Sequence, residues 1–258
     1  MAEQQPFASF GPDPFASVGI ASNPEPRCPC VLLLDVSGSM AEVVADAGKD
    51  LGQTVQQDGQ TYRVVSGGVS RIDKLNEGLR TYQSELMGDS LAAQRVEVSV
   101  ITFGSRVETV CPFVIAQEFN APTLTANGET PLGAAILQAI DAVAERKRVY
   151  KQNGLHYYRP WIFMITDGEP TDSWQEAANK VKEGEKNKNF SFFAVGVEGA
   201  NFEKLRQIST REPLPLKGYS FREMFLWLSQ SQKSVSQSNP GQEGNVKLPS
   251  PSGWAELG

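Results

Sequence analysis

Oxygen-bearing side chains follow the first long apolar run of the chain. The run ends at Asp35, and Ser37 and Ser39 stand two and four residues beyond it. A carboxylate at the end of a buried strand is costly to desolvate unless it has a partner. Carboxylate and hydroxyl oxygens are the ligands that hard divalent cations prefer in proteins. The spacing therefore indicates a candidate cation site just beyond this strand.

Two later segments carry oxygen donors of the same kind. Thr130 precedes a helical pattern in NGETPLG, and Asp167 follows an apolar strand in the turn TDGEPTD. Taken singly, Thr130 could cap its helix, and the Asp167-Gly168 pair is an ordinary turn dipeptide. Taken together, these donors favour one shared site for a divalent metal. Its candidate ligands are Asp35, Ser37, Ser39, Thr130 and Asp167.

Strand patterns and helical patterns alternate along most of the chain. Strands are expected at 30–35, 95–104, 108–115, 161–166, 190–197 and, at the sheet edge, 213–219. Helices are expected at 71–87, 130–147, 172–185, 201–209 and 220–230. The alternation predicts an α/β fold with a doubly wound, mostly parallel central sheet and helices on both faces. A short turn before 108–115 predicts that this strand is an antiparallel edge strand.

Helix starts and strand ends place the candidate ligands. We expect Thr130 to be the N-cap of its helix, with Pro131 at the first helical position, and Ser220 with Glu223 to form a capping box. In a doubly wound sheet, functional residues lie at the carboxyl ends of the strands, and the candidate ligands all fall on that rim.

A phosphate-binding loop is a poorer explanation of these residues, because AGKD at 47–50 lacks the other residues of a P-loop.

An insertion of about residues 41–70 separates the first strand from the first helix. Two β-prone runs within it are joined by Asp58-Gly59, a strong hairpin signal. We predict a β-hairpin that rises from the metal rim, with Asp58, Gly59 and Tyr62 as candidate partner-binding residues. The alternative is a surface insertion with no role, since long loops are tolerated thermodynamically.

The ligand motifs resemble the metal-ion-dependent adhesion site (MIDAS) of von Willebrand factor type A (vWA) domains. D-x-S-x-S, the T-P-L-G threonine and the D-G aspartate occur in the right order, and the resemblance spans Pro29 to about Ser229. It implies a non-catalytic module that holds Mg²⁺, with Mn²⁺ or Ca²⁺ as alternatives. An open coordination position would accept an Asp or Glu from a protein partner. Two acidic residues, Glu129 and Asp172, are further candidates for the rim.

Several segments look closer to the bacterial TerY/YegL-like branch of this family. They are RIDKLNEGL, VSVITFG, TPLGAAI, YYRPWIFMITDGEPTD and FSFFAVGVEGA. This resemblance implies an association with tellurite resistance and stress response, and with PP2C-type phosphatase and kinase-like partners in the cytoplasm.

Two other functions are weighed against a binding module. A metal-dependent phosphoester hydrolase would need more carboxylates and a general base, whereas the only histidine, His156, precedes a strand and is expected at the opposite end of the sheet. An adaptor subunit of a separate AAA-type ATPase is the other alternative.

Composition limits the partners and the compartment. A formal net charge of −6 and a pI near 5.0 argue against nucleic acid or an anionic membrane as partners. Cys28, Cys30 and Cys111 cannot build a disulfide framework and are expected to be small apolar residues near strands. The N-terminus resembles no signal peptide, so we expect a cytoplasmic protein.

Three regions are expected along the chain. Residues 1–26 form a disordered or extended tail, in which Phe7 and Phe15 belong to a near repeat, QPFASFG and DPFASVG, that could bind a partner. Residues 27–229 form the vWA domain with the insertion. Residues 230–258 form a second tail, which Trp254 could fix to the domain.

Overall fold

The structure is a computed structural model that describes residues 23–44, 49–57, 60–66 and 68–256. Its centre is a six-stranded sheet in the order β5-β4-β1-β6-β7-β8. The strands are β1 (Cys28–Asp35), β4 (Val96–Phe103), β5 (Val107–Ile115), β6 (Trp161–Thr166), β7 (Ser191–Gly196) and β8 (Leu214–Pro215). Only β5 runs antiparallel to its neighbour within this sheet. The predicted doubly wound, mostly parallel sheet with one antiparallel edge strand is confirmed.

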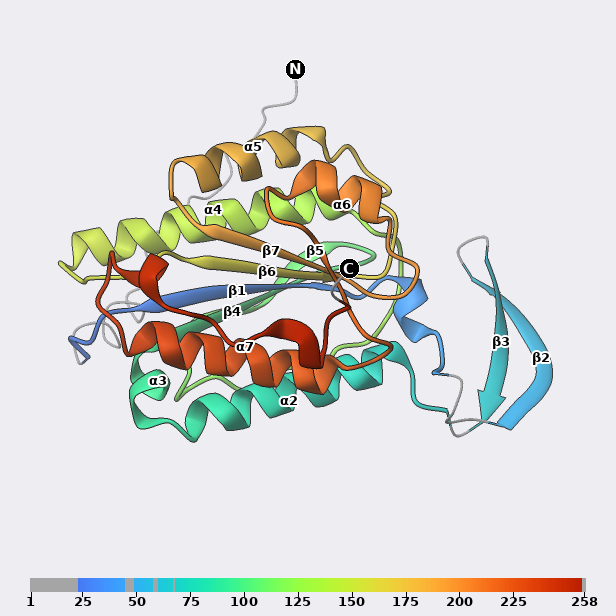
Figure 1. Ribbon diagram of the computed structural model, residues 1–258. Helices are drawn as coiled ribbons and strands as arrows, with labels where there is room; N and C mark the ends of the chain where they lie inside the picture. Colours follow the sequence, from blue (N-terminus) through green and yellow to red (C-terminus); the bar gives the residue numbers. More distant parts are fainter. Residues whose placement is uncertain (1–22, 45–48, 58–59, 67, 257–258) are drawn as a thin grey trace, which may run out of the picture.

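Helices cover both faces of the sheet (Figure 1). One face carries α2 (Arg71–Met87), α3 (Ser90–Arg95) and α7 (Phe221–Ser236), and the other carries α4 (Leu132–Gln152), α5 (Gln175–Lys186) and α6 (Phe202–Ile208). Strand β1 is buried on both sides: Leu32 and Leu34 pack toward the first group, Val31 and Leu33 toward the second. Two apolar cores explain why β1 reads as an uninterrupted apolar run.

Within the described ranges, no helix is long and apolar enough to cross a lipid bilayer.

Two predicted helix caps are wrong. Pro131 has a ψ of 64°, so α4 begins at Leu132 and Thr130 does not cap it. Ser220 precedes α7 but makes no side-chain capping bond, so the predicted capping box with Glu223 is absent. Helix α7 also extends past the expected end at 230, to Ser236, and the short helix α3 is an element that no periodicity predicted.

The predicted hairpin is present in the insertion. Strands β2 (Lys49–Gln57) and β3 (Gln60–Ser66) pair antiparallel as a separate two-stranded sheet. They stand clear of the main body, on the side where β1 ends (Figure 1). At the base of the hairpin, Val43 pairs with Ser70, and Val44 N donates to Val69 O at 2.8 Å. The insertion therefore leaves and re-enters the domain at a single closed neck.

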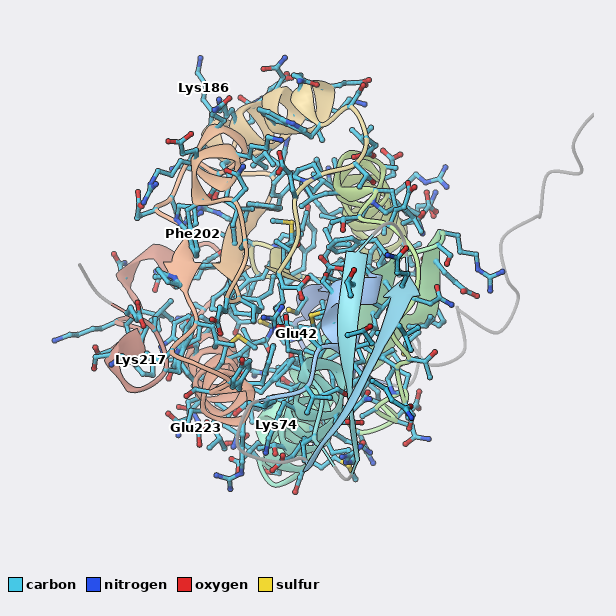
Figure 2. All side chains as sticks on the ribbon, turned by 90° about the vertical axis from the view of Figure 1, so that its right-hand side faces the viewer. Glu42, Lys74, Lys186, Phe202, Lys217 and Glu223 are labelled. Carbon is cyan, nitrogen blue, oxygen red and sulfur yellow. The ribbon has the colours of Figure 1, made fainter. Side chains whose placement is uncertain are left out.

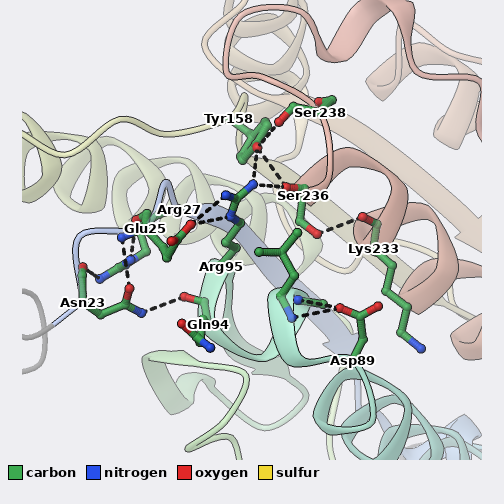
Figure 3. Close-up of polar contacts among 12 residues, drawn as sticks. Asn23, Glu25, Arg27, Asp89, Gln94, Arg95, Tyr158, Lys233, Ser236 and Ser238 are labelled. Atoms are coloured by element: carbon green, nitrogen blue, oxygen red, sulfur yellow. Dashed lines mark hydrogen bonds and ion pairs between the residues drawn. The ribbon is translucent and has the colours of Figure 1, made fainter.

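A polar network closes the amino end of the sheet (Figure 3). Arg95 donates to Glu25, to the Tyr158 hydroxyl and to the carbonyl of Ser236. These bonds join the first described residues of the chain to the end of α7. Nearby, the fully buried Glu97 accepts hydrogen bonds from Arg27 and Arg146. Three separate segments are thereby joined at this end.

The described part of the C-terminal segment packs back onto the domain. Ala255 bridges to Leu216 beside β8, and Trp254 is only 1% exposed. The ring of Trp254 lies 5.3 Å from that of Trp227 on α7, and Trp227 Nε1 donates to the carbonyl of Pro249. The segment therefore extends the core on this face of the sheet, because the ring of Trp227 also lies 6.3 Å from that of Phe163 on β6. Two short 3₁₀ helices, η2 (Glu243–Asn245) and η3 (Pro251–Gly253), lie along it.

The cysteines are free and sit in or beside the sheet. Cys28 and Cys30 on β1 are buried, and burial raises the pKa of the Cys30 thiol to about 12. Both therefore behave as small apolar core residues.

Candidate metal centre

Asp35 ends β1 as a fully buried carboxylate. Its Oδ1 accepts the backbone N–H of Ser37 at 2.8 Å, and its Oδ2 accepts the hydroxyl of Thr166 at 2.6 Å. Burial and, to a smaller extent, the neighbouring charge of Asp167 together raise the pKa of Asp35 to about 7. Asp35 is thus held in place by β1 and β6. Neither of these two hydrogen bonds comes from a positively charged group.

Ser37, Ser39 and Asp167 form a continuous chain of oxygens. The hydroxyls of Ser37 and Ser39 lie 3.0 Å apart, and Ser39 Oγ donates to Asp167 Oδ1 at 2.6 Å. Ser39 belongs to the short 3₁₀ helix η1 (Gly38–Ala41), while Asp167 directly follows β6. The structure therefore brings together side chains from two loops that the sequence places far apart.

Thr130 reaches the same rim from the β5–α4 loop. It is 5% exposed, and a Cβ built on Gly168 would lie 2.7 Å from Thr130 Oγ1. The glycine after Asp167 therefore lets the two loops approach closely. The loop is also tied to the end of β1, because Gly38 N donates to Gly128 O at 2.9 Å and Asn127 N to Val36 O at 2.7 Å.

The two further acidic candidates have different surroundings. Both oxygens of Asp172 accept backbone N–H groups of α4, from Gly133 at 2.9 Å and Ala134 at 2.8 Å. Asp172 therefore provides the helix cap that the sequence predicts for Thr130. The Thr130 hydroxyl does not cap α4. Glu129 is exposed at the rim.

Arg71 and Glu42 are members of the site that the sequence reasoning missed. Arg71 Nη1 donates to Asp167 Oδ2 at 2.9 Å, and Arg71 Nη2 lies 2.7 Å from Glu42 Oε2. The Arg71 side chain is 7% exposed, whereas that of Glu42 is 54% exposed. Figure 2 looks onto this rim, with Glu42 near the centre beside the hairpin. Arg71 had appeared only as the first residue of a helical pattern, so no sequence signal marked it.

The donor set suits a hard divalent cation. Hydroxyls of Ser37, Ser39 and Thr130 and carboxylates of Asp35 and Asp167 gather at one edge of the sheet, and all are oxygen ligands of the kind Mg²⁺ takes. Among the described residues, no group of three or more His, Cys, Asp or Glu side chains could hold a metal. A cation here would therefore depend on the hydroxyls, which are three of the five candidate ligands.

The other residues predicted to bind a partner lie away from this rim or outside the residues that the structure describes. Tyr62 lies on β3, opposite Val55 in the hairpin register. Asp58, Gly59, Phe7 and Phe15 fall outside the described residues. The only histidine, His156, is at the other end of the sheet, where its carbonyl accepts Arg27 N just before β1.

The fold and the rim define a class: a doubly wound α/β domain with hydroxyls and carboxylates gathered at the carboxyl ends of its strands. Residues 30–223 match the von Willebrand factor type A domain. The chain belongs to this family, so the family predicted from the motifs is confirmed.

Solved structures with the same fold include bacterial pilus proteins. The pilus adhesin SpaC from Lactobacillus rhamnosus GG is 14% identical, with a TM-score of 0.57 over 81% of this chain and 31% of its own. A minor pilin PilB mutant from Streptococcus sanguinis is 12% identical (TM-score 0.54, 84% and 64% covered). The von Willebrand factor type A protein from Catenulispora acidiphila is 16% identical (TM-score 0.53, 81% and 43% covered). The chain spans less than two thirds of each, and at these identities the likeness shows the fold alone. No curated protein matches the chain.

Proposed function

We propose that this chain is a non-catalytic protein-interaction module that works through a divalent metal. Mg²⁺ would be held by Asp35, Ser37, Ser39, Thr130 and Asp167, with Mn²⁺ or Ca²⁺ as substitutes. The partner would be a protein that supplies an Asp or Glu carboxylate to an open coordination position. Neither nucleic acid nor a membrane is part of this proposal.

The observation that supports the proposal is the hydrogen-bonded oxygen chain across two loops. Ser37, Ser39 and Asp167 are joined through side-chain contacts of 3.0 and 2.6 Å, and Asp35 lies fully buried beside them. A cation between these two buried carboxylates would offset the repulsion by which the charge of Asp167 helps to raise the pKa of Asp35. Mg²⁺ prefers six oxygen ligands and keeps water where the protein offers none, so an exchangeable position would remain.

The inserted hairpin would take part in partner recognition. Its neck, at Val43 and Ser70, adjoins η1 and the first turn of α2, so anything that docks on the metal must border it. A two-stranded sheet on its own is marginally stable and offers unpaired edges. The hairpin, including Tyr62, would read or gate the docked partner, and removal of residues 47–68 should then change partner affinity or metal affinity.

By resemblance to the TerY/YegL-like branch, the module would organise a cytoplasmic stress-response complex related to tellurite resistance. PP2C-type phosphatase and kinase-like proteins would be the partners.

A pull-down from the native host tests the function. Wild type and Asp35→Ala are compared, each with Mg²⁺ and with a chelator. The proposal expects a protein that is retained only by wild type with Mg²⁺. Identical lanes would contradict a role for the metal site. Hydrolysis of a generic phosphoester by wild type, abolished by Asp35→Ala, would instead revive the enzyme alternative.

A further inference from the structure

A buried guanidinium shares a carboxylate with the candidate metal site. Asp167 uses Oδ1 to accept Ser39 Oγ at 2.6 Å and Oδ2 to accept Arg71 Nη1 at 2.9 Å. Arg71 therefore lies on the far side of the same carboxylate that faces the candidate ligands. Both side chains are almost fully shielded from water, at 7% and 0% exposed. Solvent screening between this charge and the site is correspondingly weak.

This arrangement fixes the charge of the site. Asp35 and Asp167 could together cancel the charge of a divalent ion, but Arg71 offsets one of the two negative charges. Glu42 pairs with the other side of Arg71 at 2.7 Å, yet it is half exposed and screened by water. A cation in this site would therefore keep a net positive charge.

We infer that Arg71 is a resident counter-charge that weakens metal binding by the chain alone and leaves the bound ion in need of an external carboxylate. The inference rests on the proposed function, because it assumes that the rim binds a divalent cation. Metal binding and partner binding would then strengthen each other. The carboxylate of a partner protein would replace the negative charge of Asp167 that Arg71 offsets. Glu42 moderates the effect from the opposite side.

The position of these two residues also connects the site to the hairpin. Glu42 and Arg71 flank the insertion, and Arg71 N donates to Glu42 O at 3.0 Å in addition to the side-chain pair. A partner that contacts the neck of the hairpin would act on the ion pair that sets the charge of the metal site. Arg71 is therefore a positioning and charge-setting residue rather than a ligand.

The test is titration of Mn²⁺ into purified full-length protein, with no partner present. Arg71→Met removes the charge and should tighten Mn²⁺ binding about tenfold, because a unit charge is lost close to the ion at low dielectric. Arg71→Lys keeps a unit positive charge beside Asp167, so Mn²⁺ affinity should stay within about threefold of wild type. Glu42→Gln leaves Arg71 less neutralised and should weaken binding about threefold. The matched control is Glu145→Gln, a 56% exposed glutamate paired with Arg148 on α4, which should not change binding.

A purely structural role for Arg71 predicts the opposite sign. Its loss would then disorder the rim and weaken Mn²⁺ binding, and weaker or unchanged binding by a folded Arg71→Met overturns the inference. Thermal unfolding in chelator establishes whether each variant is folded. If Arg71→Met does not fold, Glu42→Gln decides: unchanged or tighter binding than wild type overturns the inference. Absence of Mn²⁺ binding by wild type would refute the proposed function itself, which is a separate result.

Discussion

Ser39 and Asp167 are 128 positions apart in the sequence, yet the Ser39 hydroxyl donates to Asp167 Oδ1 at 2.6 Å. Ser39 is placed by the loop after β1 and Asp167 by the loop after β6, and these strands are parallel neighbours with Leu34 opposite Ile165. Parallel neighbours end at the same edge of a sheet, so their following loops meet. The contact brings a neutral donor and a buried carboxylate to one place, which is what a cation site built from hydroxyls requires.

The free energy of unfolding of the metal-free protein should fall as the pH rises. Burial and the charge of Asp167 raise the pKa of Asp35 from 3.8 to about 7, so the folded protein binds this proton more tightly than the unfolded chain. The stabilising contribution is complete below pH 3.8 and is lost as the pH rises through about 7. Urea unfolding in chelator at a series of pH values measures the loss, and Mg²⁺ should restore more stability at the high end of the series.

Asp35→Asn is the control for this pH dependence. It cannot ionise, so its free energy of unfolding should change less over the same interval. An equally steep loss in Asp35→Asn would assign the pH dependence to other groups and contradict the prediction.

Gly168→Ala should impair the metal site more than the fold. The new Cβ would lie 2.7 Å from Thr130 Oγ1, so the threonine or the loop must shift. We expect at least about tenfold weaker Mn²⁺ binding, with a loss in unfolding free energy of about 1–3 kcal/mol. Calorimetric titration and urea unfolding measure the two effects.

The matched control for Gly168 is Gly244→Ala. A Cβ at Gly244 meets nothing within 4 Å, so both quantities should stay at wild-type values. Normal Mn²⁺ affinity in Gly168→Ala would indicate that the close approach to Thr130 has no importance for binding.

Glu97→Ala should strongly destabilise the domain without touching the metal rim. Glu97 lies at the amino end of β4 and neutralises Arg27 at 3.0 Å and Arg146 at 2.7 Å. Its removal leaves the buried guanidinium of Arg27 and the largely buried one of Arg146 without their carboxylate, which costs about 3–5 kcal/mol. Glu108→Ala breaks an exposed ion pair with Arg106 and should cost about 1 kcal/mol or less. Similar midpoints of urea unfolding for the two variants would contradict this prediction.

Trp254→Ala tests the packing of the C-terminal segment. Trp254 is 1% exposed against Trp227, so its truncation should remove about 3–5 kcal/mol of unfolding free energy. Val55→Ala changes an apolar side chain that is 51% exposed and should stay within about 0.5 kcal/mol of wild type. A small effect of Trp254→Ala would mean that this segment contributes little to the stability of α7.

The sequence predicted the parts of the fold and site that depend on local pattern. The apolar run of β1 is uninterrupted because this strand is buried on both faces. The apolar residues of α2 recur at helical spacing because this helix buries one face. The gathering of Asp35, Ser39, Thr130 and Asp167 followed from topology, since strand ends of a parallel sheet share one edge.

What escaped prediction depends on contacts between distant segments. Thr166 reads as an ordinary strand residue, and its bond to Asp35 depends on the register of β6 against β1. Asp172 caps α4 from another loop, so no local pattern could distinguish it from Thr130. Arg71 reaches Asp167 because the neck of the insertion closes, which sequence spacing does not encode.

The most direct test of the metal site is calorimetric titration of Mn²⁺ into wild type, Asp35→Ala and Asp141→Ala. Asp141 is an exposed aspartate on α4 and serves as the control for loss of one carboxylate. We expect one bound ion per chain in wild type and Asp141→Ala, and none in folded Asp35→Ala. Failure of wild type to bind, or equal affinity in Asp35→Ala, would contradict a cation site at this rim.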